Sequence, residues 1–227
     1  MSTDFAALSR LLDERWTCRA FAPTPVPRVE IERLLALAQR TPSWCNTQPW
    51  EVIVTSGEET GRLREALGAY VMSQPQASDF EFPTAFPGAY GDRRRECGFQ
   101  LYDSLGIEKS DADGRFRQML RNFEFFDAPH VALITVEADL GPYALLDTGI
   151  YVSSLLLGAQ ALGLAAAPQA ALAGYADFFR AHFGLPENRR VAVGMSLGYA
   201  AVEEPVNGFR TTRADLADVV AWHGSWA

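Results

Sequence analysis

Two stretches of the chain carry side chains whose types and spacing suit the binding of a polar, planar ligand. The first, residues 41–50, reads Thr-Pro-Ser-Trp-Cys-Asn-Thr-Gln-Pro-Trp. Its prolines stop regular structure, and its serine and amide side chains offer hydrogen bonds without net charge. Flat aromatic surface beside such groups suits a planar heterocycle with polar edges. The alternative is a structural turn in which Trp44 and Trp50 pack in the core.

The second stretch, residues 15–21, reads Arg-Trp-Thr-Cys-Arg-Ala-Phe and places two arginines four positions apart. In an extended strand or an irregular turn, both guanidinium groups can converge on one anion. Arginine suits phosphate because its planar fork donates two hydrogen bonds in parallel. The stretch therefore predicts a phosphate site, and a solvated pair of surface arginines is the alternative.

The elements that must position the first stretch follow from hydrophobic spacing. Apolar residues recur at i, i+3, i+4 and i+7 from Ile31, which predicts a helix over residues 28–40. The β-branched run at residues 52–54 predicts a buried strand. Residues 41–50 therefore join the end of a helix to the start of a strand.

The same rules predict the other elements. Residues 143–164 are apolar on nearly all sides of a helix, which predicts burial on every side and hence contact with a second subunit. Residues 165–171 have small side chains, which would let a ligand approach the backbone closely. Further helices are expected over residues 3–13, 57–74 and 175–183, a helical turn near 216–222, and strands over 131–136 and 191–199.

Residues 73–126 differ from the rest because they are rich in aromatic side chains and in clustered charge. Two helices are expected there, at about 88–105 and 111–125. An insertion of this length inside a domain is usually functional, so we expect a lid or a binding wall. The alternative is a pair of surface helices with their own small cluster. With this insertion, residues 1–227 are expected to form a single domain.

The composition argues against several classes of function. A net charge of −8 over 227 residues disfavours nucleic acid as a partner, because binding there needs a basic face. The first four residues lack the cationic start of a secretory signal, and residues 143–164 contain an aspartate that disfavours a membrane span. The three cysteines lack metal-ligand spacing. We therefore expect a protein of the reducing cytoplasm with no metal site.

The chain resembles the FMN-dependent nitroreductase family over almost its whole length. The resemblance implies an α+β fold: a three-layer α/β/α sandwich with a central, mostly antiparallel sheet and a C-terminal arm exchanged in a homodimer. Four ordered motifs carry it: residues 15–21, similar to the family's Arg-x-Ser/Thr-x-Arg/Lys-x-Phe opening; residues 42–50; Ala161-Leu162-Gly163-Leu164 leading to Pro168-Gln169; and residues 213–220, similar to its Arg-x-x-Leu-x-Glu-Val ending.

The resemblance implies which residues hold the phosphate end of FMN. Arg15, Thr17 and Arg213 would bind the phosphate, and Trp16 would contribute its backbone. Many members carry a lysine two positions before the last arginine, where this chain has a threonine, so Arg210 is expected to substitute.

The resemblance also assigns the residues around the flavin ring. Arg19 would lie by the N1–C2 carbonyl edge, where negative charge accumulates on reduction. Four residues of the partner subunit would line the ribityl chain and the dimethylbenzene edge, and four more would lie along the ring, with a backbone N–H reaching N5. The first set is Pro42, Ser43, Trp44 and Asn46, where Trp44 departs from the family's small serine; the second is Pro168, Gln169, Ala170 and Ala171.

The activity implied is the reduction of nitroaromatic or quinone-like acceptors by NAD(P)H, in ping-pong hydride transfer through FMN. The flavin performs the chemistry, so no catalytic histidine or carboxylate is required. The planar acceptor is expected to stack on aromatic rings of the insertion, with Phe123, Phe125 and Phe126 as first choices. An FMN-binding protein without turnover, which stores or senses flavin, is the alternative.

A second alternative is a serine hydrolase. Residues 194–198 match G-x-S-x-G with Ser196 as the nucleophile, and Asp215 or Asp218 and His223 follow in the right order. That motif needs a strand, a sharp turn and then a helix, and residues 199–205 are a poor helix start. Only a short tail remains to carry the acid and the base, which disfavours this interpretation.

Overall fold

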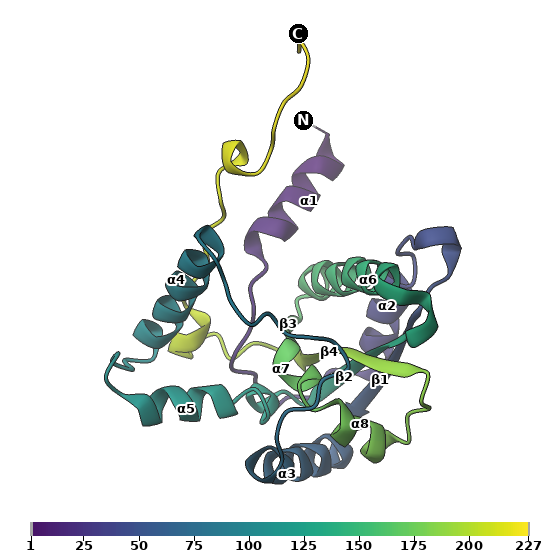
Figure 1. Cartoon of the computed structure of the whole chain (residues 1–227), viewed down its shortest axis with the longest axis vertical. Coiled ribbons are helices and arrows are strands. Elements are labelled where there is room, and N and C mark those ends of the chain that lie inside the picture. The colour runs from purple at the N-terminus through teal and green to yellow at the C-terminus, as the bar shows by residue number, and fades with distance from the viewer. Residues whose placement is uncertain (1, 227) are drawn as a thin grey trace.

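A four-stranded antiparallel sheet forms the centre of the computed structural model, which describes residues 2–226 (Figure 1). The strand order is β1-β2-β4-β3, and every neighbouring pair is antiparallel. β3 was predicted only as a stretch of small side chains, because its alanines and proline carry no strand signal and its pairing with β4 decides its structure. The strands are β1 (Trp50–Ser56), β2 (His130–Glu137), β3 (Ala165–Gln169) and β4 (Arg189–Gly198).

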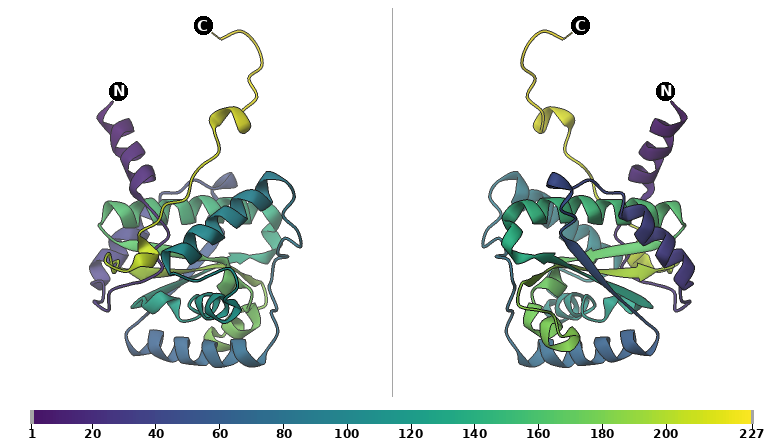
Figure 2. Two further views of the ribbon diagram at one scale, coloured as in Figure 1. Left: turned by 90° about the vertical axis from the view of Figure 1, so that its left-hand side faces the viewer. Right: turned by 90° about the vertical axis from the view of Figure 1, so that its right-hand side faces the viewer.

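Helices cover both faces of the sheet, so the predicted three-layer arrangement is confirmed (Figure 2). Side chains along a strand alternate between faces. On β2, Val131 and Leu133 pack into the cluster of α3 (Glu58–Ser73), α7 (Ala170–Ala173) and α8 (Ala176–Phe183). The alternate residues Ala132 and Ile134 pack into the cluster of α2 (Arg28–Ala38) and α6 (Gly141–Ala161).

The long helix α6 is buried on one side only within this chain. Its inner face includes Tyr151 and Leu155, and it lies close to α2 at Gly158, where an added Cβ would come within 2.7 Å of Leu34. Its outer face leaves Tyr143 and Leu146 exposed. By length and composition, one helix of the described chain, Ala138–Ala161, could cross a membrane, but core helices of soluble proteins pass the same test.

The insertion contains α4 (Ala89–Ser104) and α5 (Ala112–Leu120), which lie together on one side of the sheet (Figure 1). α4 agrees with its predicted range. α5 ends earlier than predicted, because the chain then turns through Phe125, Phe126 and Asp127, all with positive φ.

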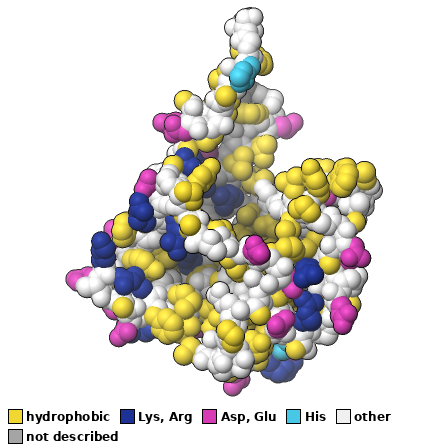
Figure 3. Space-filling model, in the orientation of Figure 1, with side chains coloured by type: hydrophobic (Ala, Val, Ile, Leu, Met, Phe, Trp, Pro, Cys, Tyr) yellow, Lys and Arg dark blue, Asp and Glu magenta, His cyan; other side chains and the backbone are white. Residues whose placement is uncertain are grey.

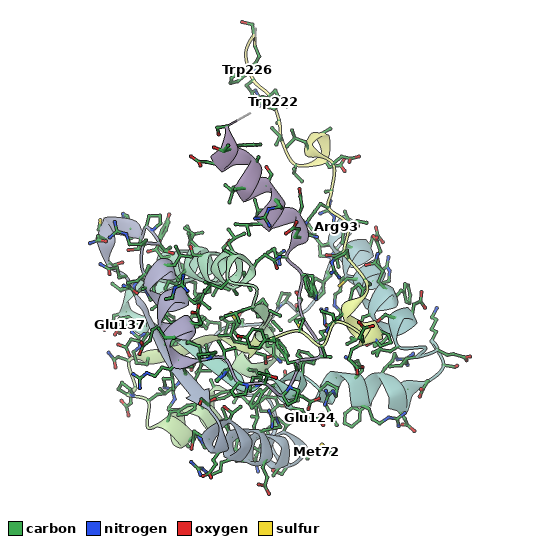
Figure 4. The ribbon with its side chains drawn as sticks, turned by 180° about the vertical axis from the view of Figure 1, so that it is seen from behind. Met72, Arg93, Glu124, Glu137, Trp222 and Trp226 are labelled. Atoms are coloured by element: carbon green, nitrogen blue, oxygen red, sulfur yellow. The ribbon has the colours of Figure 1, made fainter. Side chains whose placement is uncertain are left out.

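Both ends of the chain project from the sandwich in the same direction (Figures 1 and 2). Helix α1 (Thr3–Glu14) has no buried residue, and most of the arm after residue 207 is exposed. Trp222 and Trp226 lie at the far end of that arm, away from the body (Figure 4). The short 3-10 turns are η1 (Trp44–Asn46), η2 (Phe125–Asp127), η3 (Ala138–Leu140), η4 (Pro205–Asn207) and η5 (Leu216–Asp218).

Candidate functional site

The segment after α1 is extended and lies along the edge of the sheet. Thr17 forms a parallel bridge to Ala166 of β3, and the backbone N–H of Cys18 donates to the Ala166 carbonyl at 3.1 Å. Alternate residues of an extended chain point to the same side. Arg15, Thr17 and Arg19 therefore share one side, as the predicted phosphate site requires.

These side chains line a cavity of about 340 Å³ between the segment and the C-terminal arm. Basic side chains gather around the hollow beneath α1 and the arm (Figure 3). Four arginines and one carboxylate, Asp13, are among the lining residues, although the whole chain is acidic. Within residues 2–226 none of these arginines forms an ion pair: Arg15, Arg19, Arg210 and Arg213.

Arg19 is the most constrained of the four. Its backbone N–H donates to Asn207 Oδ1 at 2.8 Å, and its guanidinium donates to the Thr17 carbonyl at 3.3 Å. Burial lowers the pKa of this guanidinium, while the neighbouring thiols of Cys97 and Cys18 raise it. A cation with no counterion and little solvent is prepared to stabilise negative charge on a ligand.

Trp16 and Arg210 form a stacked pair at the same cavity. The Arg210 guanidinium lies 4.3 Å from the centre of the Trp16 ring. The indole Nε1 of Trp16 is buried, and no hydrogen-bond acceptor contacts it in the part of the chain that the structure describes. A buried donor without a partner is costly, which suggests that a ligand supplies the acceptor.

Asn207 fastens the arm to this cavity, and no sequence motif indicates it. It is buried, accepts from Arg19, and donates at 2.9 Å to the carbonyls of Ala20 and Ala201. Asn207 thus holds the start of the arm, and with it Arg210 and Arg213, beside residues 15–20. A lone asparagine in a polar stretch gives no sequence signal for such a role.

The end of β3 reaches the next part of the predicted site. The side chain of Gln169 is buried and bonded within the protein: its Oε1 accepts from Ser196 Oγ at 2.6 Å, and its Nε2 donates to the Asn122 carbonyl at 2.8 Å. The side chain of Gln169 is therefore not free to bind a ligand.

The serine hydrolase interpretation is wrong. Ser196 is 0% exposed and lies inside β4, which continues to Gly198 without the sharp turn that a nucleophile elbow needs. Its hydroxyl donates to Gln169 rather than to a histidine.

The residues between α2 and β1 form a tight, strained segment. Cys45, Asn46 and Gln48 have φ of 51°, 57° and 47°, in the left-handed region that non-glycine residues seldom adopt. The Trp44 N–H donates to Asp147 Oδ2 of α6 at 3.0 Å, and the Gln48 N–H donates to Ser43 Oγ at 2.9 Å. Strain of this kind is often found where a protein prepares a binding surface.

The two tryptophans of this segment have different environments. Trp50 packs in the core, 4.6 Å from the Tyr151 ring, as the structural alternative requires. Trp44 is 62% exposed and lies 5.2 Å from the ring of Tyr143, which is also exposed. Hydrophobic side chains gather on this side of the molecule (Figure 3).

The structure does not bring the strained segment and the arginine cavity together within one chain. Trp44 contacts Asp147 near the start of α6, whereas Trp16 lines a small cavity with Gln160 near its end. These positions are 13 residues apart on one helix, or about 20 Å at 1.5 Å per residue. Within one chain, the two groups therefore lie near opposite ends of α6 rather than around one cavity.

The prediction that three phenylalanines wall an acceptor pocket is wrong for their side chains. The three side chains are only 2%, 0% and 2% exposed for Phe123, Phe125 and Phe126. They belong to the core cluster on the face of the sheet that α3, α7 and α8 cover. The Phe123 ring packs edge-on against Tyr175 at 5.2 Å. Apolar rings in a core and rings in a binding wall give the same sequence signal, so only the structure separates them.

Comparisons with known proteins agree with this geometry. The model of the nitroreductase family matches residues 12–199. Nitroreductase NfnB of Mycolicibacterium smegmatis is 38% identical over 213 residues, which cover 93% of this chain and 91% of that protein. The 4-nitrobenzoate reductase of Pseudomonas putida is 33% identical over 214 residues, covering 94% and 92%.

A solved structure of a nitroreductase has the same fold as this chain over nearly its whole length. The FMN-dependent nitroreductase NfnB from Mycobacterium smegmatis, crystallised in complex with NADPH, superposes with a TM-score of 0.92 at 37% identity. The match covers 97% of this chain and 99% of that one.

Proposed function

The chain belongs to the nitroreductase family, and we propose that it is an FMN-dependent oxidoreductase that uses NAD(P)H to reduce nitroaromatic or quinone-like acceptors. The observation that carries this proposal is the cavity lined by four unpaired arginines. Its size and charge suit one phosphate group and leave room for the start of a sugar chain.

The residues present fit FMN. Three cations and two hydroxyl side chains surround a site for one phosphate, and charge-assisted hydrogen bonds from arginine to phosphate are strong. The unpaired indole N–H of Trp16 supplies a further donor. When bound, FMN would accept hydride from NAD(P)H and pass it to the acceptor. The residues proposed to hold its phosphate are Arg15, Thr17, Arg210, Thr211 and Arg213.

The chain contributes orientation and electrostatics. Arg19, partly desolvated and without a counterion, would stabilise negative charge at the pyrimidine edge of the ring. The backbone of Ala170 and Ala171, at the start of α7, would offer neutral contacts along the ring. No side-chain acid or base is assigned a role in this mechanism.

We propose that the remaining contacts come from a second copy of the chain in a homodimer. Pro42, Ser43, Trp44 and Asn46 would line the flavin of the partner subunit, since about 20 Å of α6 separates them from the cavity of their own chain. The exposed apolar face of α6 supports a large interface. The three free cysteines support a cytoplasmic location.

The first experiment is the visible spectrum of the purified protein, followed by acid release of the bound flavin. We expect FMN rather than FAD, bleached anaerobically by NAD(P)H and recovered on addition of a nitroaromatic or a quinone. Release of FAD, or no binding after FMN is added, would contradict the cofactor assignment. Bound FMN that NAD(P)H does not bleach would favour the alternative of flavin storage or sensing.

A further inference from the structure

Ser196 is a buried polar residue to which the proposed function gives no role. It lies near the end of β4, where it pairs in register with Ala167 of β3. Its hydroxyl reaches along the sheet to Gln169, the last residue of β3, at 2.6 Å. The serine therefore connects two adjacent strands through side chains as well as through the backbone.

The Gln169 amide is bonded at both of its ends. The oxygen accepts from Ser196, and the nitrogen donates to the backbone carbonyl of Asn122 at 2.8 Å, with a longer contact to Asn122 Oδ1 at 3.4 Å. A carbonyl can accept but not donate, so the Asn122 contact fixes which end of the amide carries the nitrogen. Ser196 then has to be the donor to the amide oxygen, so hydrogen bonds are donated from Ser196 to Gln169 and from Gln169 to Asn122.

β3 has few other constraints at this point. It has five residues, three alanines with little side chain to pack, and Pro168, which has no N–H to donate to the ladder. After Gln169 the chain turns at once into α7, whose Leu172 packs against β4 so closely that a Cβ on Gly194 would come within 2.3 Å of it. The end of β3 is thus held by two contacts: the packing of Leu172 against β4 and the hydrogen bonds of the Gln169 side chain.

The other end of this chain of bonds is the end of the insertion. Asn122 follows α5 and precedes η2, whose Phe125 and Phe126 have positive φ and fully buried rings. That turn is anchored in the core through its aromatic side chains. Gln169 is therefore held between β4 and a fixed point of the insertion.

We propose that Ser196, Gln169 and Asn122 form a positioning relay that fixes the backbone of Ala170 and Ala171 against the flavin ring. By doing so the relay sets the relative affinity of the site for oxidised and reduced FMN. This inference rests on the proposed function. None of the three side chains has to touch the cofactor, so they are positioning residues rather than catalytic ones.

The test compares Ser196→Ala with Thr60→Val in the FMN-loaded protein. Thr60 is also buried and donates to Thr55 Oγ1 at 2.9 Å, but this bond joins α3 to β1, at the opposite edge of the sheet from β3. Each variant removes one buried hydroxyl, so a general loss of packing affects both. The readouts are the FMN dissociation constant by fluorescence, the midpoint potential and the visible spectrum.

We expect Ser196→Ala to change the ratio of the affinities for oxidised and reduced FMN by about tenfold, as expected for one lost buried hydrogen bond. For a two-electron couple, that ratio corresponds to a shift of about 30 mV. Thr60→Val should leave the midpoint potential and spectrum as they are in the wild type. Gln169→Met, which keeps the length and loses both bonds, should match or exceed Ser196→Ala, and Ser196→Cys, which keeps a weak donor, should fall between.

If Ser196→Ala and Gln169→Met bind FMN with the affinity, spectrum and potential of Thr60→Val, the relay does not exist. If Ser196→Ala does not fold, Ser196→Cys and Gln169→Met decide by the same comparison. Failure of the wild-type protein to bind FMN at all would instead contradict the proposed function, so the two failures are distinguishable.

Discussion

The arginine cavity and the strained segment at residues 43–48 are the two parts of the predicted site, and they are built in opposite ways. The cavity is concave, and its four cations have no counterion among the described residues. The segment is already bonded within its own chain, through Asp147 and Ser43, and it turns Trp44 outward. The cavity therefore presents positive charge, whereas the segment presents a surface whose shape is fixed by bonds within its own chain.

This difference indicates how the site is divided. A cavity that holds a phosphate needs uncompensated positive charge, and its arginines donate to backbone carbonyls and a hydroxyl but to no carboxylate of the described residues. If the segment contacts a flavin bound to the other subunit, as proposed above, a shape fixed beforehand favours binding, because ordering it at the moment of binding would cost affinity. The positive φ values and the buried aspartate serve that purpose.

The largest expected effect comes from removing the arm that closes the cavity. A chain truncated after Glu204 loses Asn207, Arg210 and Arg213. Two lost charge-assisted bonds to phosphate cost about 1.5–3 kcal/mol each, so FMN affinity should fall by at least a hundredfold, to a colourless protein. The flavin-to-protein absorbance ratio measures this. A truncated protein that keeps stoichiometric FMN would show that the arm is not part of the site.

A single arginine should have a smaller effect of the same kind. Arg213→Ala should weaken FMN binding by about ten- to a hundredfold in a fluorescence titration, with little change in thermal stability. Arg93→Ala is the control: Arg93 lies on α4 beside the arm (Figure 4) but does not line the arginine cavity. Equal losses in the two variants would mean that only the general positive field matters.

The segment at residues 43–48 can be tested through its anchor. Asp147→Leu removes the acceptor of the Trp44 N–H, so the segment loses its fixed shape, and FMN affinity should fall by about tenfold. Asp147→Asn keeps an oxygen that can accept and should bind FMN nearly as the wild type does. If Asp147→Leu still forms a dimer and binds FMN with wild-type affinity, the segment has no part in the site.

Trp16→Phe should have a modest effect, because it removes the indole N–H together with the five-membered ring but keeps a benzene ring for Arg210 to stack on. Loss of one neutral hydrogen bond predicts about two- to tenfold weaker FMN binding. Trp50→Phe is the control: its indole donates to Gln39 at 3.1 Å in the α2 layer, so it should lose stability and keep FMN affinity. An unchanged affinity in Trp16→Phe would show that Nε1 has no acceptor on the ligand.

A group outside both regions gives the smallest expected effect. Burial lowers the pKa of His130 below its ordinary value of about 6.5, against a backbone contact from Thr55 that raises it. The neutral imidazole accepts from the Val26 N–H at 2.9 Å. Between the unfolded-state pKa and the lower folded-state pKa, His130 binds more protons in the unfolded chain than in the folded one. The free energy of unfolding should therefore fall as the pH drops through this interval.

Urea denaturation at about pH 7.5 and about pH 5.5, on either side of the ordinary value, measures this loss. His130→Gln keeps an acceptor and does not titrate, so it should lose less stability over the same interval. Equal losses in both proteins would assign the pH dependence to other groups.

Much of the fold could be predicted because most elements are long and periodic. The helices over residues 28–40 and 57–74 and the strands around residues 133 and 194 were predicted within a few residues of their observed bounds. β3 was missed because its alanines and proline have no strand preference of their own. Its partner β4, which follows some twenty residues later, imposes the structure, and no local pattern reports that pairing.

The site was predictable where charge carried the signal and not where burial did. Arg15 and Arg19 stand out because two arginines four positions apart suit an anion, Arg213 was assigned through the family resemblance, and the structure brings all three to one cavity. Asn207 gave no sign, and Ser196 stood out only through a hydrolase motif, because a buried hydrogen bond between distant residues leaves no trace in spacing. The sequence could not show that Trp44 is exposed while Phe125 is buried, because both residues appear only as aromatic side chains in aromatic-rich stretches.

The central claim is that one flavin site is drawn from two copies of the chain, and mixed dimers test it most directly. One partner would carry Arg15→Ala and Arg213→Ala, and the other would have residues 43–46 replaced by a flexible Gly-rich tetrapeptide. Each variant alone should bind almost no FMN. Co-expressed with separate tags and purified as the mixed dimer, they should bind one FMN per dimer, because one of the two sites then has both intact halves. A mixed dimer that stays colourless would contradict the shared site and show that both halves must belong to the same chain.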